Sequence, residues 1–192
     1  MKILILGYSN LVKKKILEVV IKNKINFCIA SKSSKSNEPK AYNWFRDYGE
    51  ALKKSEANFV YISLPNSLHY YWAKRALKMN YNVIVDKPLC ENLKQANDLI
   101  KIAKQKNKFI SESVFFNFHK QFEKSIKIIG GYNKIKHISA NFIIPMPSKK
   151  SLLLSKKFEG GALMDMGPYA AAVPRLIYKK NKLTQLSNYN KK

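Results

Sequence analysis

Short apolar runs alternate with segments of helical periodicity over about the first 115 residues. Strands are predicted at residues 3–6, 25–30, 59–64, 82–85 and 109–113, the first of them buried on both faces. Helices are predicted between them, most clearly at residues 12–20, 67–80 and 92–103, and Asn92 with Gln95 indicates a capped start of the last one. Strands that alternate with helices join through right-handed crossovers into a parallel sheet. The pattern therefore predicts an α/β fold with a doubly wound parallel Rossmann sheet.

The periodicity changes beyond residue 115. A helix is predicted over residues 119–129, a strand over 134–144 and a helix over 160–178. One strong strand cannot form a stable sheet, so the second domain is predicted to be a partial α+β domain. The expected division is a Rossmann domain at 1–115, a catalytic or substrate domain at 116–182 and a polar tail at 183–192. The unpaired apolar strand also predicts a homo-oligomer or a complementing chain.

The formal net charge of +24 raises the hypothesis of a basic nucleic-acid-associated protein. Only three of the 36 basic residues are arginine, and lysines occur on every predicted helix instead of along one stripe. Nucleic-acid readers ordinarily use arginine forks and stacking aromatic side chains. We therefore expect a solvated lysine surface and no nucleic-acid partner, and keep nucleic-acid association as a third function.

The cysteines and the apolar runs indicate the setting of the chain. Cys28 and Cys90 are too few for a disulfide framework and lack the spacing of a metal site. The apolar run at residues 1–7 is too short for a signal-peptide core, and no run approaches the roughly 18 apolar residues of a membrane span. We expect a cytoplasmic protein with no metal and no membrane association.

The turn after the first predicted strand stands where dinucleotide-binding proteins carry the glycine-rich fingerprint G-x-G-x-x-G. Only Gly7 is present, with Ser9 and Val12 at the other two positions. Small residues here let the backbone approach a pyrophosphate, which binds amides at the start of the next helix. Alternatively, Gly7 only ends a strand. Its place between strand and helix favours a cofactor turn made of Gly7, Ser9, Asn10 and Leu11.

The end of the second predicted strand distinguishes NAD from NADP. An acidic residue at this point would bind the 2′-hydroxyl of the NAD ribose, but the sequence has Ser31, Lys32 and Ser33. A lysine between two hydroxyls suits a 2′-phosphate, so the sequence favours NADP and leaves NAD possible. The alternative is an ordinary surface lysine.

Two further strand ends face the same crevice, where open α/β sheets bind their ligands. After the first of them come Leu64, Pro65, Asn66 and His69, which are expected to line the cofactor site. Asn66 has the alternative of a helix cap, and His69 that of a packed core residue. The next strand ends in Asp86-Lys87-Pro88, a charged pair between a buried strand and a proline, and Asp86 and Lys87 are expected to contact the cofactor.

Two separated motifs carry a resemblance to a known family. The run from Tyr61 to Asp98 includes Asp86-Lys87-Pro88, and a second motif runs from Gly160 to Tyr169. Together they resemble the glucose-fructose oxidoreductase / inositol dehydrogenase / MocA (Gfo/Idh/MocA) family, whose motifs are E-K-P and G-G-x-L-x-D-x-G-x-(H/Y). The resemblance covers essentially the whole chain. The family's members are considerably longer, so the chain is expected to be truncated.

The resemblance implies an NAD(P)-dependent oxidoreductase acting on a hydroxyl or carbonyl group of a sugar, a sugar derivative or a polyol. It implies that Lys87 lies beside the nicotinamide, with Asp165 and Tyr169 on the other side of the substrate. Oxidising an alcohol needs a base for the hydroxyl proton, and a lysine ammonium beside a phenol favours the phenolate. Pro168 lies between Asp165 and Tyr169 and stands against a regular helix there. The alternative is a catalytically inactive nucleotide-binding protein of the same fold.

Overall fold

The computed structural model describes residues 1–32, 41–148, 151 and 154–177. The described residues form two compact units, one within 1–114 and 144–168 and the other within 115–143 and 169–177. Residues 144–168 thus join the first unit, although the sequence groups them with the second. The predicted domain boundaries stay a prediction, and the predicted tail lies outside the described residues.

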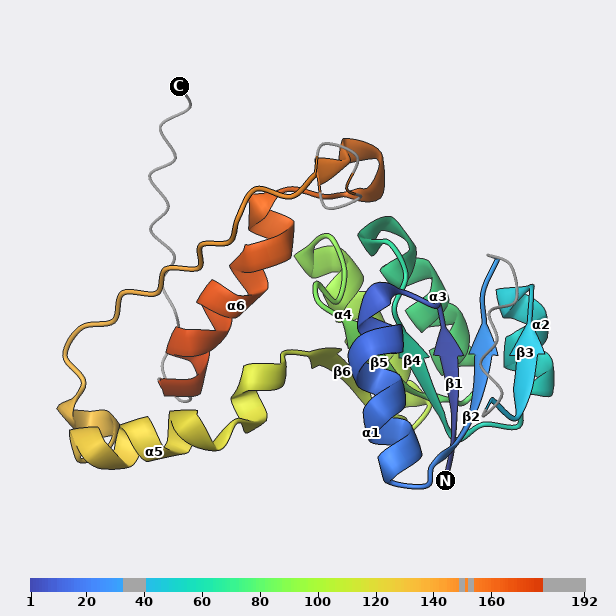
Figure 1. Ribbon diagram of the computed structural model, residues 1–192, viewed down its shortest axis with the longest axis horizontal. Helices are drawn as coiled ribbons and strands as arrows, with labels where there is room; N and C mark the ends of the chain where they lie inside the picture. Colours follow the sequence, from blue (N-terminus) through green and yellow to red (C-terminus); the bar gives the residue numbers. More distant parts are fainter. Residues whose placement is uncertain (33–40, 149–150, 152–153, 178–192) are drawn as a thin grey trace. The chain divides into compact units, whose positions relative to one another are not determined.

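The first unit contains a six-stranded parallel sheet with the order β3-β2-β1-β4-β5-β6 (Figure 1). The chain crosses from one side of β1 to the other after β3, which is the doubly wound Rossmann topology. The predicted fold class is confirmed. The strands are β1 (Lys2–Leu6), β2 (Asn26–Ala30), β3 (Asn43–Phe45), β4 (Phe59–Ile62), β5 (Asn82–Asp86) and β6 (Ile110–Ser113).

Helices cover both faces of this sheet because successive strand residues point to opposite sides. Leu4 and Leu6 of β1 belong to one buried cluster, and Ile5 between them belongs to the other. The larger cluster includes side chains of α2, α3 and α4, and the smaller one those of η1 and α1. The helices of this unit are η1 (Val12–Ile16, a π-helical turn), α1 (Leu17–Lys22), α2 (Tyr48–Lys54), α3 (Asn66–Lys78), α4 (Leu93–Gln105) and η5 (Lys156–Phe158).

Two elements of the first unit, strand β3 and helix α2, were not expected from the sequence. Strand β3 has three residues, too few for a visible alternation, and α2 has seven. A local signal for α2 does exist, because the Asp47 side chain accepts a hydrogen bond from the Glu50 amide at 2.7 Å. An aspartate three residues before a glutamate is a recognised helix start.

The second unit begins with η2 (Phe115–Phe118), α5 (Lys120–Ile129) and η3 (Tyr132–Lys134). The predicted strand at 134–144 is wrong, because residues 135–148 form no strand. A strand needs a neighbour to pair its amides and carbonyls, and every ladder among the described residues belongs to the first unit's sheet. The argument for a homo-oligomer or complementing chain therefore loses its basis.

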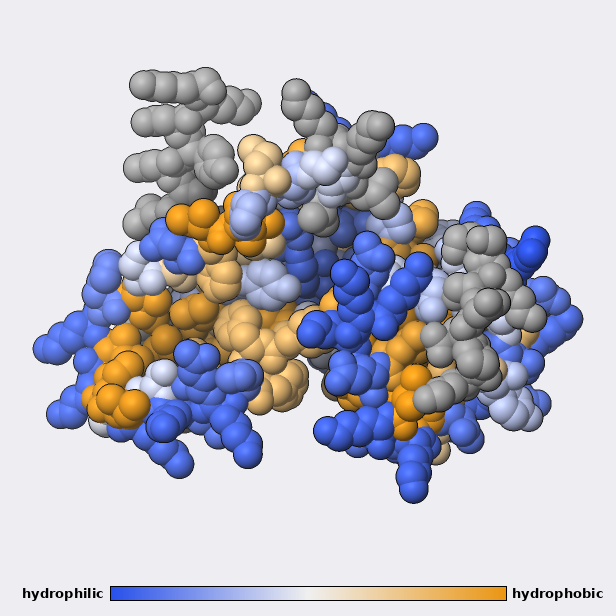
Figure 2. All heavy atoms as spheres, viewed as in Figure 1, coloured by the Kyte–Doolittle hydropathy of each residue, from blue (hydrophilic) through white to orange (hydrophobic). Residues whose placement is uncertain are grey.

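Helix α6 (Ala162–Ile177) is continuous through Pro168, against the expectation that this proline disturbs it. Asp165 and Tyr169 consequently lie four residues apart on one regular helix. No helix among the described residues combines the length and the apolar character that a membrane crossing requires. In Figure 2, hydrophilic side chains are spread over the visible face instead of lying along one stripe.

Candidate functional site

The turn after β1 is built around Gly7. Its φ is +97°, its amide donates to the Ala30 carbonyl at 2.9 Å, and an added Cβ would lie 2.1 Å from the Ser63 carbonyl oxygen. Only glycine fits a turn packed this closely against the end of β4. The tight turn explains why this glycine of the fingerprint is present.

Ser9 and Val12 fill the other two fingerprint positions. The Ser9 hydroxyl accepts the Val12 amide at 3.1 Å and so caps the start of the following helix. Val12 is fully buried and packs in the core cluster beside Ile5 and Leu17. The amides of Asn10 and Leu11, at the start of that helix, have no acceptor one turn earlier within it, and such amides are donors for phosphate. These residues fit a dinucleotide pyrophosphate.

A chain of hydrogen bonds crosses the carboxyl ends of β1, β4 and β5. The Ser9 and Ser63 hydroxyls lie 2.8 Å apart, and Ser63 donates to Asp86 Oδ2 at 2.5 Å. The Tyr61 hydroxyl donates to Asp86 Oδ1. Asp86, which was predicted to contact the cofactor, is thus bonded to side chains of the neighbouring strand β4.

Lys87 and Asp165, 78 residues apart in the sequence, form an ion pair within the first unit. Lys87 Nζ also donates to the Asp165 backbone carbonyl at 2.6 Å. The two side chains are 18% and 12% exposed, which makes this the least exposed of the ion pairs formed by the described residues. A pair so poorly solvated needs both partners, because either charge alone would be left uncompensated.

His69 has a different role from the expected one. Its side chain is 1% exposed, with Nδ1 2.7 Å from the Pro88 carbonyl and Nε2 2.7 Å from the Leu64 carbonyl. With both ring nitrogens against backbone oxygens, the imidazole has no nitrogen left for a cofactor. The core alternative describes it better, since His69 ties together the loops after β4 and β5.

The loop after β4 also holds the segment before α6. Asn66 donates to the Glu159 carbonyl at 3.0 Å and does not cap α3, so the capping alternative does not apply. Leu64 and Pro65 lie at the carboxyl end of β4, where the sequence places the crevice. Their contact with a cofactor stays a prediction.

The end of β2 is anchored to β3. The Ser31 amide donates to the Phe45 carbonyl at 2.9 Å, and Lys32 Nζ lies 5.8 Å from the centre of the Tyr48 ring. Burial raises the pKa of Tyr48, which keeps its phenol neutral beside Lys32. Lys32 is exposed at this edge, and Ser33 lies outside the described residues.

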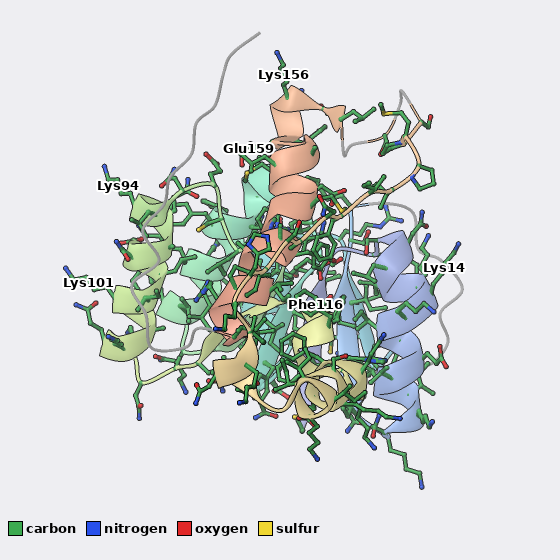
Figure 3. The ribbon with its side chains drawn as sticks, turned by 90° about the vertical axis from the view of Figure 1, so that its left-hand side faces the viewer. Lys14, Lys94, Lys101, Phe116, Lys156 and Glu159 are labelled. Atoms are coloured by element: carbon green, nitrogen blue, oxygen red, sulfur yellow. The ribbon has the colours of Figure 1, made fainter. Side chains whose placement is uncertain are left out.

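Tyr169 belongs to the second unit, where it joins an aromatic cluster that sequence reasoning missed. Its ring stacks on Phe142 with centroids 5.7 Å apart and lies 6.1 Å from Phe116, which is labelled in Figure 3. Phe116 lies in a short helix and Phe142, about 26 residues later, in a coil, so no periodic pattern in the sequence indicates that they meet. The approach of Tyr169 to Lys87 stays a prediction.

Glu159, labelled in Figure 3, was also missed. Burial, together with a hydrogen bond and the negative charge of Glu91, raises the pKa of Glu159 from 4.5 to about 7.

No group of three or more histidine, cysteine or acidic side chains that could hold a metal occurs among the described residues.

The raised pKa predicts that Glu159 makes stability depend on pH. Folding favours its protonated form, so its contribution is complete below about pH 4.5 and is lost as the pH rises through about 7. Glu159→Gln should remove this contribution. We expect it to stabilise the protein relative to wild type by about 1 kcal/mol at pH 8 and not at pH 4.5, since solvent screens this partly exposed group. Urea unfolding at both pH values measures the difference, and an equal effect at both would contradict the prediction.

The sequence of the first unit is similar to that of a known protein family. Residues 1–114, which hold the whole sheet and the first turn, match the model of the oxidoreductase family with an NAD-binding Rossmann fold, GFO_IDH_MocA. The chain belongs to the Gfo/Idh/MocA oxidoreductase family. The resemblance inferred from the two motifs is thereby confirmed.

Relatives within the Gfo/Idh/MocA family include an uncharacterised oxidoreductase of Rhizobium meliloti, 31% identical over 70% of this chain and 41% of that protein. A dTDP-3,4-didehydro-2,6-dideoxy-alpha-D-glucose 3-reductase of Actinomadura kijaniata is 30% identical over 64% of this chain and 37% of that protein. The chain spans about two fifths of the length of these relatives.

A solved structure shows the same fold. It is a 3-ketoreductase of Actinomadura kijaniata in complex with NADP and TDP-benzene, with a TM-score of 0.83 and 24% identity. The match covers 92% of this chain and 57% of that protein.

Proposed function

We propose that the chain acts as an NAD(P)-dependent oxidoreductase on a hydroxyl or carbonyl group of a sugar, a sugar derivative or a polyol. The observation that carries the proposal is the Lys87–Asp165 ion pair at the carboxyl end of β5. This edge is where ligands of doubly wound sheets bind, and Gly7 stands at the same edge after β1. Relatives named as sugar-nucleotide reductases support the substrate class.

In this proposal, each of the three candidate catalytic residues has its own chemical role. Lys87 would donate to the developing alkoxide, Asp165 would hold the lysine in place, and Tyr169 would take the hydroxyl proton. The bound nicotinamide supplies or accepts hydride. Gly7, Ser9, Asn10 and Leu11 would hold the pyrophosphate.

Tyr169→Phe tests the assignment of the base. The variant keeps the ring that stacks on Phe142 and loses only the hydroxyl, so turnover should fall by roughly 10²- to 10⁴-fold with cofactor affinity unchanged. The part of the pH–rate profile that reflects the phenol should also disappear. Steady-state kinetics with a panel of sugars and polyols provides the measurement.

Tyr132→Phe is the control, because Tyr132 lies in η3, outside the aromatic cluster. Near wild-type turnover in Tyr169→Phe would exclude this residue as the base. Saturable NADPH binding without turnover on any substrate would instead support the alternative of an inactive nucleotide-binding protein.

We also propose that NADP is preferred over NAD. Among the residues that the structure describes at the end of β2, Ser31 and Lys32, there is no carboxylate to bind a ribose 2′-hydroxyl, and Lys32 is exposed. A relative named as NADP(+)-dependent, a D-xylose 1-dehydrogenase of Haloferax volcanii, supports this preference.

Lys32→Ala should weaken NADPH binding by about tenfold or more, since a charge-assisted bond to phosphate is lost, and should leave NADH binding nearly unchanged. Fluorescence titration of both cofactors measures the two dissociation constants. Lys22→Ala, which removes an exposed lysine at the end of α1, is the matched control. An equal loss for NADPH and NADH would remove the argument from the 2′-phosphate.

A further inference from the structure

We propose that Ser9, Ser63 and Tyr61 are positioning residues that hold Lys87 in place through Asp86. The proposal rests on the proposed function, because that function gives Lys87 its task. The three residues come from the turn after β1 and from the end of β4, and Asp86 ends β5. They therefore connect three adjacent strands at the edge where the candidate site lies.

The donors and acceptors in this series of hydrogen bonds from Ser9 to Asp86 can be assigned by counting the protons that each group carries. A carboxylate only accepts, so Tyr61 and Ser63 each donate their one hydroxyl proton to Asp86. Ser63 must then accept from Ser9, whose oxygen is 2.8 Å away. Ser9 in turn accepts the Val12 amide at 3.1 Å. All donors point toward Asp86, and bonds aligned in this way strengthen one another.

The two residues that donate to Asp86 are buried, so the loss of either hydrogen bond should carry a cost in free energy. Tyr61 and Ser63 are 4% and 6% exposed, so each hydroxyl is largely closed to water, and its loss removes one of the two hydroxyls that donate to the Asp86 carboxylate. On the other side of Lys87, His69 Nδ1 lies 2.7 Å from the Pro88 carbonyl. Lys87 is thus fixed between two anchored neighbours, Asp86 and Pro88.

The network also accounts for two departures from the family motifs. Serine at position 9 replaces a glycine of the fingerprint, and Asp86 replaces a glutamate. Ser9 supplies the hydroxyl that starts the chain of side-chain donors, and Ser63 and Tyr61 both reach the short Asp86 carboxylate directly. The two replacements therefore act together.

Competitive acylation of the purified full chain with acetic anhydride tests the proposal. Mass spectrometry gives the labelling rate of Lys87 relative to Lys94, an exposed lysine on α4. In the wild type, the ion pair with Asp165 protects Lys87. In Ser63→Ala and in Tyr61→Phe, Lys87 labelling should rise by about fivefold relative to Lys94, the equivalent of one lost hydrogen bond. Ser63→Thr, which keeps the hydroxyl, should restore protection.

Ser55→Ala is the matched control, because Ser55 is fully buried and its hydroxyl contacts Tyr81, outside this network. An unchanged Lys87 rate in Ser63→Ala and Tyr61→Phe, or an equal rise in Ser55→Ala, would overturn the proposal. If Ser63→Ala does not fold, Ser9→Gly, which restores the fingerprint glycine, carries the test with the same expected rise. The readout needs no cofactor and no turnover, so its failure is distinguishable from failure of the proposed function.

Discussion

Replacing Lys87 by alanine is expected to lower turnover by roughly 10²- to 10⁴-fold while cofactor affinity changes little. The Lys87 ammonium is paired with Asp165 at the end of β5, and we assign it to the developing alkoxide. Because this interaction is made in the transition state, its loss should appear in kcat and not in the NADPH dissociation constant. Steady-state kinetics and fluorescence titration measure the two quantities.

The control must separate lost chemistry from lost stability. Lys87→Ala leaves Asp165 as an uncompensated carboxylate with 12% of its side chain exposed. The double variant Lys87→Ala/Asp165→Asn removes that charge, so it should regain thermal stability and stay inactive. Turnover close to wild type in either variant would show that Lys87 is not catalytic.

Gly7→Ala is expected to destabilise the first unit strongly. The new Cβ would lie 2.1 Å from the Ser63 carbonyl oxygen, and the backbone φ of +97° is itself strained for alanine. Relief of the overlap requires β1 or β4 to shift, which should cost at least about 3 kcal/mol of a total stability of about 5–15 kcal/mol. Circular dichroism during urea unfolding gives the change in free energy.

Gly161→Ala is the matched control within the same unit. Its φ is +121°, yet no atom lies within 4 Å of the added Cβ, so it incurs backbone strain without the overlap. A Gly7→Ala loss no greater than that of Gly161→Ala would mean that the close approach to Ser63 does not constrain the turn.

The parts of the fold that sequence predicts are those with local signals. The runs at β1, β2, β4 and β5 are apolar because both faces of a parallel sheet are covered, whereas the edge strand β6 has one apolar residue in Ile110–Ser113. The capping pair is also present, since Asn92 accepts the Gln95 amide at 3.0 Å. Strand β3 is too short to show alternation, and residues 134–144 alternate but pair with no strand among the described residues. Pairing depends on distant segments, which periodicity does not reveal.

The candidate site shows the same limit. Gly7 and Ser9 stand in the predicted turn because a local motif marks them. The pairing of Lys87 with Asp165 spans 78 residues and came only from the family resemblance. No local signal indicates that both ring nitrogens of His69 lie 2.7 Å from backbone carbonyl oxygens or that Glu159 meets Glu91.

Titration of the purified chain with NADPH tests the central claim most directly, because a dinucleotide site at the carboxyl edge of the sheet underlies every role assigned above. The account predicts saturable binding at one site per chain, tighter for NADPH than for NADH, with a thermal stability that rises with cofactor concentration. A folded chain that shows neither a saturable signal nor a stability shift with either cofactor would contradict it.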